Sequence, residues 1–268
     1  MGQIMFVMWR ETVEAMLVVG VLHAWLARQP DARTAQRYLW LGVAAGVVAA
    51  VVLGCGIEAL DQSLDGEGRD YFQAVLMLLA AALIVQMVFW MRRHGRGMRQ
   101  QLEGELAQRV AQSQHWGVAT LAGIAVAREG SETVVFLGGL LRGGAGFASA
   151  EFWLALILGF ALAALSFGLL QWGGKRVGWR LFFRVSETLL LLLGCALLVG
   201  SVEQLIGLDV VPTGIARVWD SRWLVDDGRT FGSLLAAFTG YRAQPSLTVL
   251  VVVAVYWLGV VWRARMFR

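Results

Sequence analysis

The stretch WRETVEAMLVVGVL, residues 9–22, places an arginine and two glutamates inside a segment that is otherwise apolar. At about 100° per residue, Arg10, Glu11 and Glu14 would share one face of a helix. Each ionised residue at the centre of a membrane helix costs roughly 2.5 to 3.5 kcal/mol on insertion scales, so such groups usually serve a function. If the segment lies in a membrane, the stretch therefore indicates a functional site.

The rest of the chain has the composition of a polytopic membrane protein. Of its 268 residues, 58% are hydrophobic and 16% are charged, whereas about a quarter of the residues in a soluble domain are charged. Because about 20 helical residues cross the hydrocarbon core, the apolar runs predict seven membrane helices. They cover residues 3–26, 38–60, 71–91, 116–141, 151–172, 179–204 and 246–262. These runs lack the alternation of barrel strands, so the predicted fold class is all-α.

The charged motif occurs a second time. AREGSETVVFLGGLL carries Arg128, Glu129 and Glu132 with the spacing of the first copy. Because the copies are three crossings apart, the first and fourth helices run in opposite directions. Residues 1–91 and 116–204 are therefore predicted to be inverted three-helix repeats, which place a binding site at their shared midplane.

The predicted repeats belong to one membrane domain, residues 1–268. The seventh helix, residues 246–262, has no counterpart in either repeat and is interpreted as an accessory. Between it and the second repeat lies an outer loop at 205–245, which is long for a compact bundle.

The two motifs carry more negative than positive charge. Two arginines can neutralise only two of the four glutamates. A hard cation ligated by carboxylate oxygens would balance the remaining two charges. The competing interpretation, in which two Arg–Glu pairs only lock the bundle, leaves this excess unexplained.

The paired motifs resemble those of the oxidase-dependent iron permeases of fungi and bacteria, whose hallmark is R-E-x-x-E in the first and fourth of seven helices. RETVE at 10–14 and REGSE at 128–132 match it, and FQAVLMLLAAALIVQMVFWMRR in the third helix and VWDSRWLVDDG in the outer loop extend the similarity. The resemblance implies iron uptake rather than enzyme activity, with iron as cargo and no tightly bound cofactor. It implicates as iron ligands Glu11, Glu14, Glu129 and Glu132, with Arg10 and Arg128 as charge partners. Bacterial relatives often have a carboxylate where this chain has Gln73.

Two other classes of function remain open. One is a carrier for another metal such as manganese or lead, and the other is a membrane redox enzyme with a di-iron centre. Di-iron sites usually add Glu-x-x-His pairs, which this sequence lacks. The three histidines, His23, His94 and His115, are too scattered for a conventional zinc, copper or haem site.

The basic residues predict how the chain is oriented. Fifteen of the 23 Lys and Arg residues lie on one side of the predicted helices and six on the other, four of these in the 205–245 loop. The positive-inside rule then places the N-terminus outside and the C-terminus in the cytoplasm. The family resemblance implies that the membrane is the plasma (inner) membrane. The pI near 9.6 fits this topology and contact with the lipid bilayer. No motif for nucleic acid is present.

Acidic residues near the helix ends are further candidates. Glu58, Asp61 and Glu203 could form a metal entrance on the outer side. Glu187 lies near the inner end of the predicted sixth helix, three residues after Arg184. It is interpreted either as a metal ligand at the exit or as one partner of an interfacial ion pair.

The outer loop is too apolar for a disordered linker, so short helices are expected to lie over the outer mouth as a lid. The family resemblance adds a docking partner, an extracytoplasmic ferroxidase or iron-binding protein. Asp226 and Asp227 are expected to be exposed there.

Overall fold

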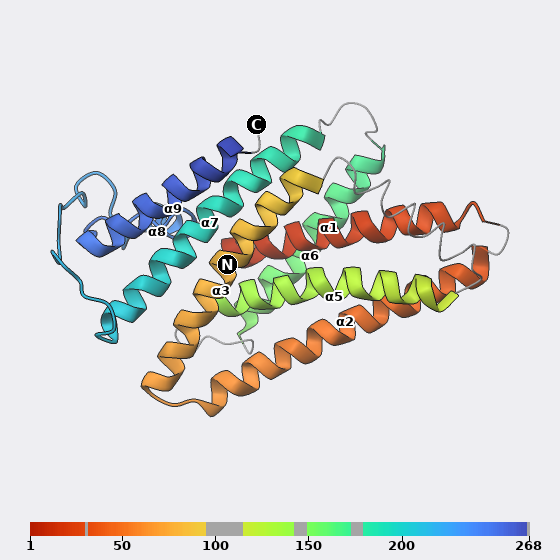
Figure 1. The fold of residues 1–268 in the computed structure, drawn as a ribbon, viewed down its shortest axis with the longest axis horizontal. Helices are drawn as coiled ribbons and strands as arrows, with labels where there is room; N and C mark the ends of the chain where they lie inside the picture. The colour runs from red at the N-terminus through yellow and green to blue at the C-terminus, as the bar shows by residue number, and fades with distance from the viewer. Residues whose placement is uncertain (30–31, 95–114, 142–148, 173–178, 267–268) are drawn as a thin grey trace.

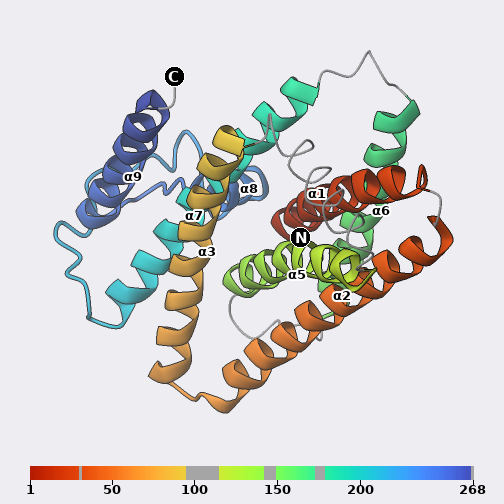
Figure 2. The ribbon, with the colours of Figure 1, turned by 45° about the vertical axis from the view of Figure 1, so that its right-hand side comes forward.

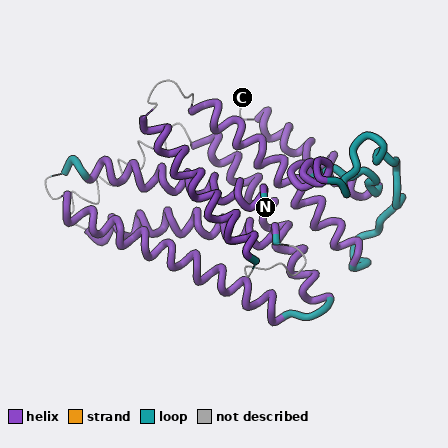
Figure 3. The backbone as a smooth tube through the Cα atoms, turned by 180° about the vertical axis from the view of Figure 1, so that it is seen from behind, coloured by secondary structure: helices purple, strands orange, loops and turns teal. Residues whose placement is uncertain are grey.

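The structure, a computed structural model, describes residues 1–29, 32–94, 115–141, 149–172 and 179–266. Within these ranges the chain forms helices and no strands (Figure 3). In the labels of Figure 1 they are α1 (Gly2–Leu26), α2 (Ala32–Ser63), α3 (Glu67–His94), α5 (His115–Leu140), α6 (Ala150–Trp172), α7 (Trp179–Gly207), α8 (Thr230–Thr239) and α9 (Leu247–Met266). The all-α class is confirmed. Helices α2 and α3 extend beyond their predicted spans at both ends, because a helix can continue past the hydrocarbon core into the headgroup region.

The protein is a polytopic membrane protein. Among the described residues, five helices are long and apolar enough to cross a membrane, namely α2, α3, α6, α7 and α9. Helices α1 and α5 have 25 and 26 residues, a sufficient length, but each carries three motif charges near its middle. That these two helices also cross the membrane stays a prediction.

Helices α2 and α5 lie side by side and run in the same direction (Figures 1 and 2). Gly42 of α2 lies against Ala119 of α5, and Gly46 lies against Gly123 one turn later. A Cβ atom at Gly46 would be 2.8 Å from the Gly123 carbonyl oxygen. Small residues therefore allow the two backbones to approach closely, as is common in membrane helix pairs.

Helices α1 and α6 form a second pair that also runs in one direction. The backbone of Gly159 in α6 lies against Met5 of α1. Further along both helices, the indole N–H of Trp9 donates a hydrogen bond to Ser166 Oγ at 2.9 Å.

The remaining long helices pack in antiparallel pairs. Ser201 Oγ of α7 donates to the carbonyl oxygen of Ala74 in α3 at 2.8 Å. The Tyr256 hydroxyl of α9 donates to the carbonyl oxygen of Leu191 in α7 at 2.7 Å. The main core lies where α1, α3, α5 and α7 meet, and its buried members include Val7, Met77, Ile84, Phe136, Leu190 and Leu193.

The outer loop contains α8, which packs against α7 and the start of α1. Gln3 Nε2 donates to the carbonyl oxygen of Ala237, and the Phe6 and Phe238 rings meet edge to face. The expectation that Asp226 and Asp227 are exposed is wrong, since both are half-buried. Their carboxylates accept backbone N–H groups of the same loop, at Gly228 (3.0 Å) and Ala243 (3.3 Å) respectively.

Candidate metal-binding site

The first motif surrounds a buried arginine on α1. Arg10 Nη1 lies 2.5 Å from Glu11 Oε1, and Nη2 lies 2.5 Å from Glu14 Oε1. The same two nitrogens donate to the sulfur atoms of Met87 and Met91 on α3, at 3.0 and 3.1 Å. The Arg10 side chain is only 3% exposed, so α1 and α3 enclose its charge.

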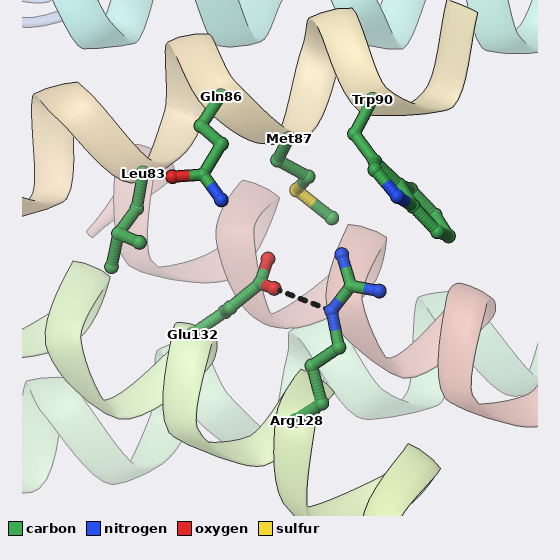
Figure 4. Close-up of a pocket in the computed structure, with 6 residues that line it drawn as sticks. All are labelled: Leu83, Gln86, Met87, Trp90, Arg128 and Glu132. Carbon is green, nitrogen blue, oxygen red and sulfur yellow. Dashed lines mark hydrogen bonds and ion pairs between the residues drawn. The ribbon is translucent and has the colours of Figure 1, made fainter. Parts of the chain in front are cut away.

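The second motif holds its arginine differently. Arg128 Nε donates to Glu132 Oε1 at 3.0 Å (Figure 4), and the guanidinium carbon lies 4.3 Å from the ring centroid of Trp90 on α3. The Arg128 side chain is 40% exposed. The two copies are therefore similar in sequence but unequal in environment.

Three carboxylates from the two motifs converge. Glu11 and Glu14 of α1 and Glu129 of α5 each offer an oxygen, and these oxygens all lie within 4.8 Å of one another. Within the described part of the chain, the second oxygens of Glu11, Glu129 and Glu132 are buried and have no hydrogen-bond partner. A buried carboxylate oxygen without a partner is costly, and a bound cation would satisfy it.

The donor set fits a hard or borderline divalent cation. Every converging ligand atom is a carboxylate oxygen, the type that such ions favour over soft thiolate or thioether ligands. Oxygen ligands on opposite sides of an ion at roughly 2.0 to 2.6 Å are about 4 to 5 Å apart, which is compatible with the observed spacing. The cluster also keeps the charge excess expected from the sequence, because Arg10 is shared by Glu11 and Glu14 while Arg128 is paired with Glu132.

A cavity of about 250 Å³ lies beside the second motif, between α3 and α5. Figure 4 shows its lining residues, which are Leu83, Gln86, Met87, Trp90, Arg128 and Glu132. Glu132 thus connects the motif to an accessible polar space.

Comparison with known proteins gives the arrangement a context. The sequence matches the iron permease FTR1 family over residues 1–266. The protein belongs to this family. It is therefore a permease for iron rather than an enzyme, as the sequence predicted.

Several curated relatives resemble the permease along most of their length. It is 28% identical over 259 residues to the ferrous iron permease EfeU of Escherichia coli O157:H7, an alignment that covers 93% of this chain and 90% of the relative. It is 27% identical over 257 residues to the ferrous iron permease EfeU of Yersinia pestis, covering 93% and 88%. The putative inactive ferrous iron permease EfeU of Escherichia coli K12 is 26% identical over 254 residues, covering 93% and 90%. No solved structure gives a significant match.

The candidate entrance residues of the permease do not join the carboxylate cluster. Asp61 Oδ2 lies 2.6 Å from Arg69 Nη2, and Asp61 Oδ1 accepts a long hydrogen bond, 3.4 Å, from Gln73. Glu58 accepts a hydrogen bond from Gln62 at 2.7 Å. These acidic groups therefore have neighbours of their own at the junction between α2 and α3.

The other two flanking acids are also paired. Glu203 Oε2 accepts from Arg242 Nη2 of the outer loop at 2.6 Å, and this bond raises the pKa of the Arg242 guanidinium above its usual value. Glu187, for which an exit ligand and an interfacial ion pair were both considered, forms an ion pair with Arg92 of α3. Both pairs connect segments that are distant in the sequence.

The part that α3 plays in the site was not predicted from the sequence. Gln73 on this helix lies away from the motifs, beside Asp61, and the residues that face the motifs are Gln86, Met87, Trp90 and Met91. A signal was available, because Gln86 is a polar residue in an apolar run and Trp90 follows it one helical turn later.

Proposed function

We propose that the permease carries ferrous iron across the membrane and that the ion binds to the four motif glutamates on its way. The observation that carries this proposal is the convergence of Glu11, Glu14 and Glu129 within 4.8 Å in a region with unpartnered buried carboxylate oxygens. The relatives are ferrous iron permeases by name, which supports Fe(II) as the transported form. Glu132, which lines the cavity beside the cluster, would bind the ion on the same path.

The proposed movement is a rocking of two inverted repeats, α1 to α3 and α5 to α7. In this proposal α1 and α5 also cross the membrane, in addition to the five candidate spans. A two-fold operation between such repeats exchanges α1 with α5 and α2 with α6. It therefore turns the α1–α6 pair into the α5–α2 pair, and both pairs are among the most extensive helix contacts and run in one direction. This equivalence supports alternating access around a site near the midplane.

The proposed orientation has the N-terminus outside the cell and the C-terminus in the cytoplasm. Support comes from the end of the bundle at which α1 and α3 end and α2 begins. Basic residues gather there, including Arg28, Arg33, Arg37, Arg92 and Arg93. Positive residues favour the cytoplasmic side.

We further propose that the outer loop receives Fe(II) from an extracytoplasmic iron-binding protein, since the other expected partner, a ferroxidase, would deliver Fe(III). Its most exposed large apolar residues are Trp223 (84%), Phe231 (73%) and Leu224 (68%), a composition common at protein interfaces. The variant Trp223→Ser should weaken uptake that depends on the partner while iron binding by the purified permease stays unchanged. Equal partner-dependent uptake would leave the loop as a lid only.

Uptake of radioactive Fe(II) into proteoliposomes tests the main proposal. The variants Glu14→Gln and Glu129→Gln keep the side-chain shape but remove an anionic ligand, so both should lose most uptake. The matched control is Glu151→Gln, at the exposed start of α6. Wild-type uptake in both cluster variants would refute the site. Competition by Mn(II) or Pb(II) at equal concentration measures whether another metal is the preferred cargo.

A further inference from the structure

The cavity between α3 and α5 has a polar end that the carboxylate cluster does not explain. Glu132 lines it, and the second oxygen of this carboxylate is buried without a hydrogen-bond partner in the described part of the chain. Glu132 is also absent from the group of three converging carboxylates. Of the four motif glutamates, Glu132 is the one that lines the cavity.

The size of the cavity suits an ion that keeps water. At about 30 Å³ per water molecule in the liquid, a volume of 250 Å³ corresponds to roughly eight waters. A divalent cation with about six oxygen ligands, most of them water, fits this space. The converging carboxylates, in contrast, suit an ion that has exchanged much of its water shell for protein oxygens.

Gln86 supplies a second ligand of the correct type. It lines the cavity, and in Figure 4 its amide group extends from α3 on the side of Glu132, with the amide nitrogen nearer the carboxylate and the oxygen turned toward Leu83. A half-turn of the amide about its last carbon–carbon bond exchanges the two atoms. Amide carbonyl oxygens are ordinary ligands of hard cations. A glutamine in an otherwise apolar membrane helix indicates a function in the same way as a charged residue does, though at lower cost.

The arginine of the cavity is held to one side. The Arg128 guanidinium stacks on Trp90 at 4.3 Å and contacts Glu132 through Nε only. A cation–π contact of this kind contributes roughly 0.5 to 2 kcal/mol. Trp90 thus holds Arg128 in a position from which it pairs with one oxygen of Glu132, and the second, buried oxygen has no hydrogen-bond partner among the described residues.

We propose that this cavity is a second cation position, in which a partly hydrated divalent cation is held by Glu132 and Gln86 next to the cluster of Glu11, Glu14 and Glu129. The ion exchanges its remaining water for carboxylate oxygens when it moves between the two positions. This inference rests on the proposed function, because it adds a step to the same iron pathway.

Transport kinetics give the first test. The variant Gln86→Leu removes the amide at similar volume and should raise the Fe(II) concentration for half-maximal uptake about tenfold, the lower end of the effect of losing a supporting group at a metal site. Gln86→Glu keeps an oxygen at the same reach and should retain the wild-type value or lower it. The matched control is Gln73→Leu on the same helix, where Gln73 bonds to Asp61. An equal value for Gln86→Leu and the wild type would overturn the second position.

Equilibrium binding separates this inference from the proposed function. Radioactive Fe(II) is added anaerobically to the purified permease in nanodiscs, and Glu129→Gln weakens the cluster without leaving an arginine unpaired. We expect Glu129→Gln to retain weak binding that the double variant with Gln86→Leu loses. Residual binding that is unchanged by Gln86→Leu, or no residual binding at all, would overturn the second position alone. Full affinity in Glu129→Gln would instead refute the proposed function.

Discussion

The substitution Glu129→Gln should stabilise the iron-free permease while weakening its affinity for iron. Glu129 has the carboxylates of Glu11 and Glu14 within 4.8 Å, and Glu132 lies one turn away on the same helix. Against these three negative neighbours stand two guanidinium groups, Arg10 and Arg128. Glu129 therefore has one repulsive neighbour in excess.

The expected gain in stability follows from Coulomb's law. Two unit charges 4.8 Å apart interact by about 3.5 kcal/mol at an effective dielectric constant of about 20. Removing the Glu129 charge should thus raise the free energy of unfolding of the iron-free protein by up to about 3.5 kcal/mol. The desolvation cost of a buried carboxylate is removed as well, and this acts in the same direction.

The expected loss in affinity has the opposite sign. One anionic ligand fewer should weaken Fe(II) binding at least about tenfold, which is about 1.4 kcal/mol. Since a ligand stabilises the folded state in proportion to RT ln(1 + [L]/Kd), the iron-induced rise in Tm should shrink by the corresponding amount. Anaerobic thermal unfolding of the purified permease, with and without Fe(II), measures both quantities. A lower Tm without iron and an unchanged iron-induced rise would refute the reasoning, and Glu151→Gln should change neither.

Two further pairs of substitutions test the helix packing and the unequal environments of the two arginines. Gly46→Ala should lower the free energy of unfolding by about 1 to 3 kcal/mol through overpacking, because its Cβ would lie 2.8 Å from atoms of α5. The control Gly56→Ala should be neutral, because no atom lies within 4 Å of its Cβ position. Thermal unfolding of both variants measures the difference. Arg10→Gln should cost about 3 to 5 kcal/mol because it leaves buried carboxylates unpaired. Arg128→Gln should cost less, about 1 to 2 kcal/mol, because its ion pair is 40% exposed on the arginine side and its contact with Trp90 adds only a modest part. Equal losses for the two arginine variants would contradict the difference in environment.

The carboxylate cluster could be anticipated from the sequence because charge in an apolar helix is a strong signal. The spacing of Arg10, Glu11 and Glu14 places them on one face of any α-helix. The second copy of the motif indicates that a second helix faces the first with the same set of charges. The excess of four glutamates over two arginines in the motifs then indicates a bound cation, and this inference does not depend on the fold. The same reasoning gave the all-α class, since apolar runs of this length form helices in a membrane.

Of the contribution of α3, only Gln86 could be anticipated in this way, as a polar residue in an apolar run. This helix is apolar on nearly all sides, so the periodicity of its sequence does not indicate which face turns toward the motifs. Met87 and Trp90 acquire their roles only when α3 is packed against α1 and α5. The pairing of Asp61 with Arg69 depends on the turn between α2 and α3, and the pairing of Glu203 with Arg242 depends on the path of the outer loop. Residue spacing specifies neither.

The most direct test of the central claim is the position of iron in crystals of the permease grown anaerobically with Fe(II). Anomalous diffraction at the iron absorption edge should give a peak between Glu11, Glu14 and Glu129, surrounded by oxygen ligands. A peak elsewhere in the membrane domain, with these three carboxylates free of metal, would contradict the account.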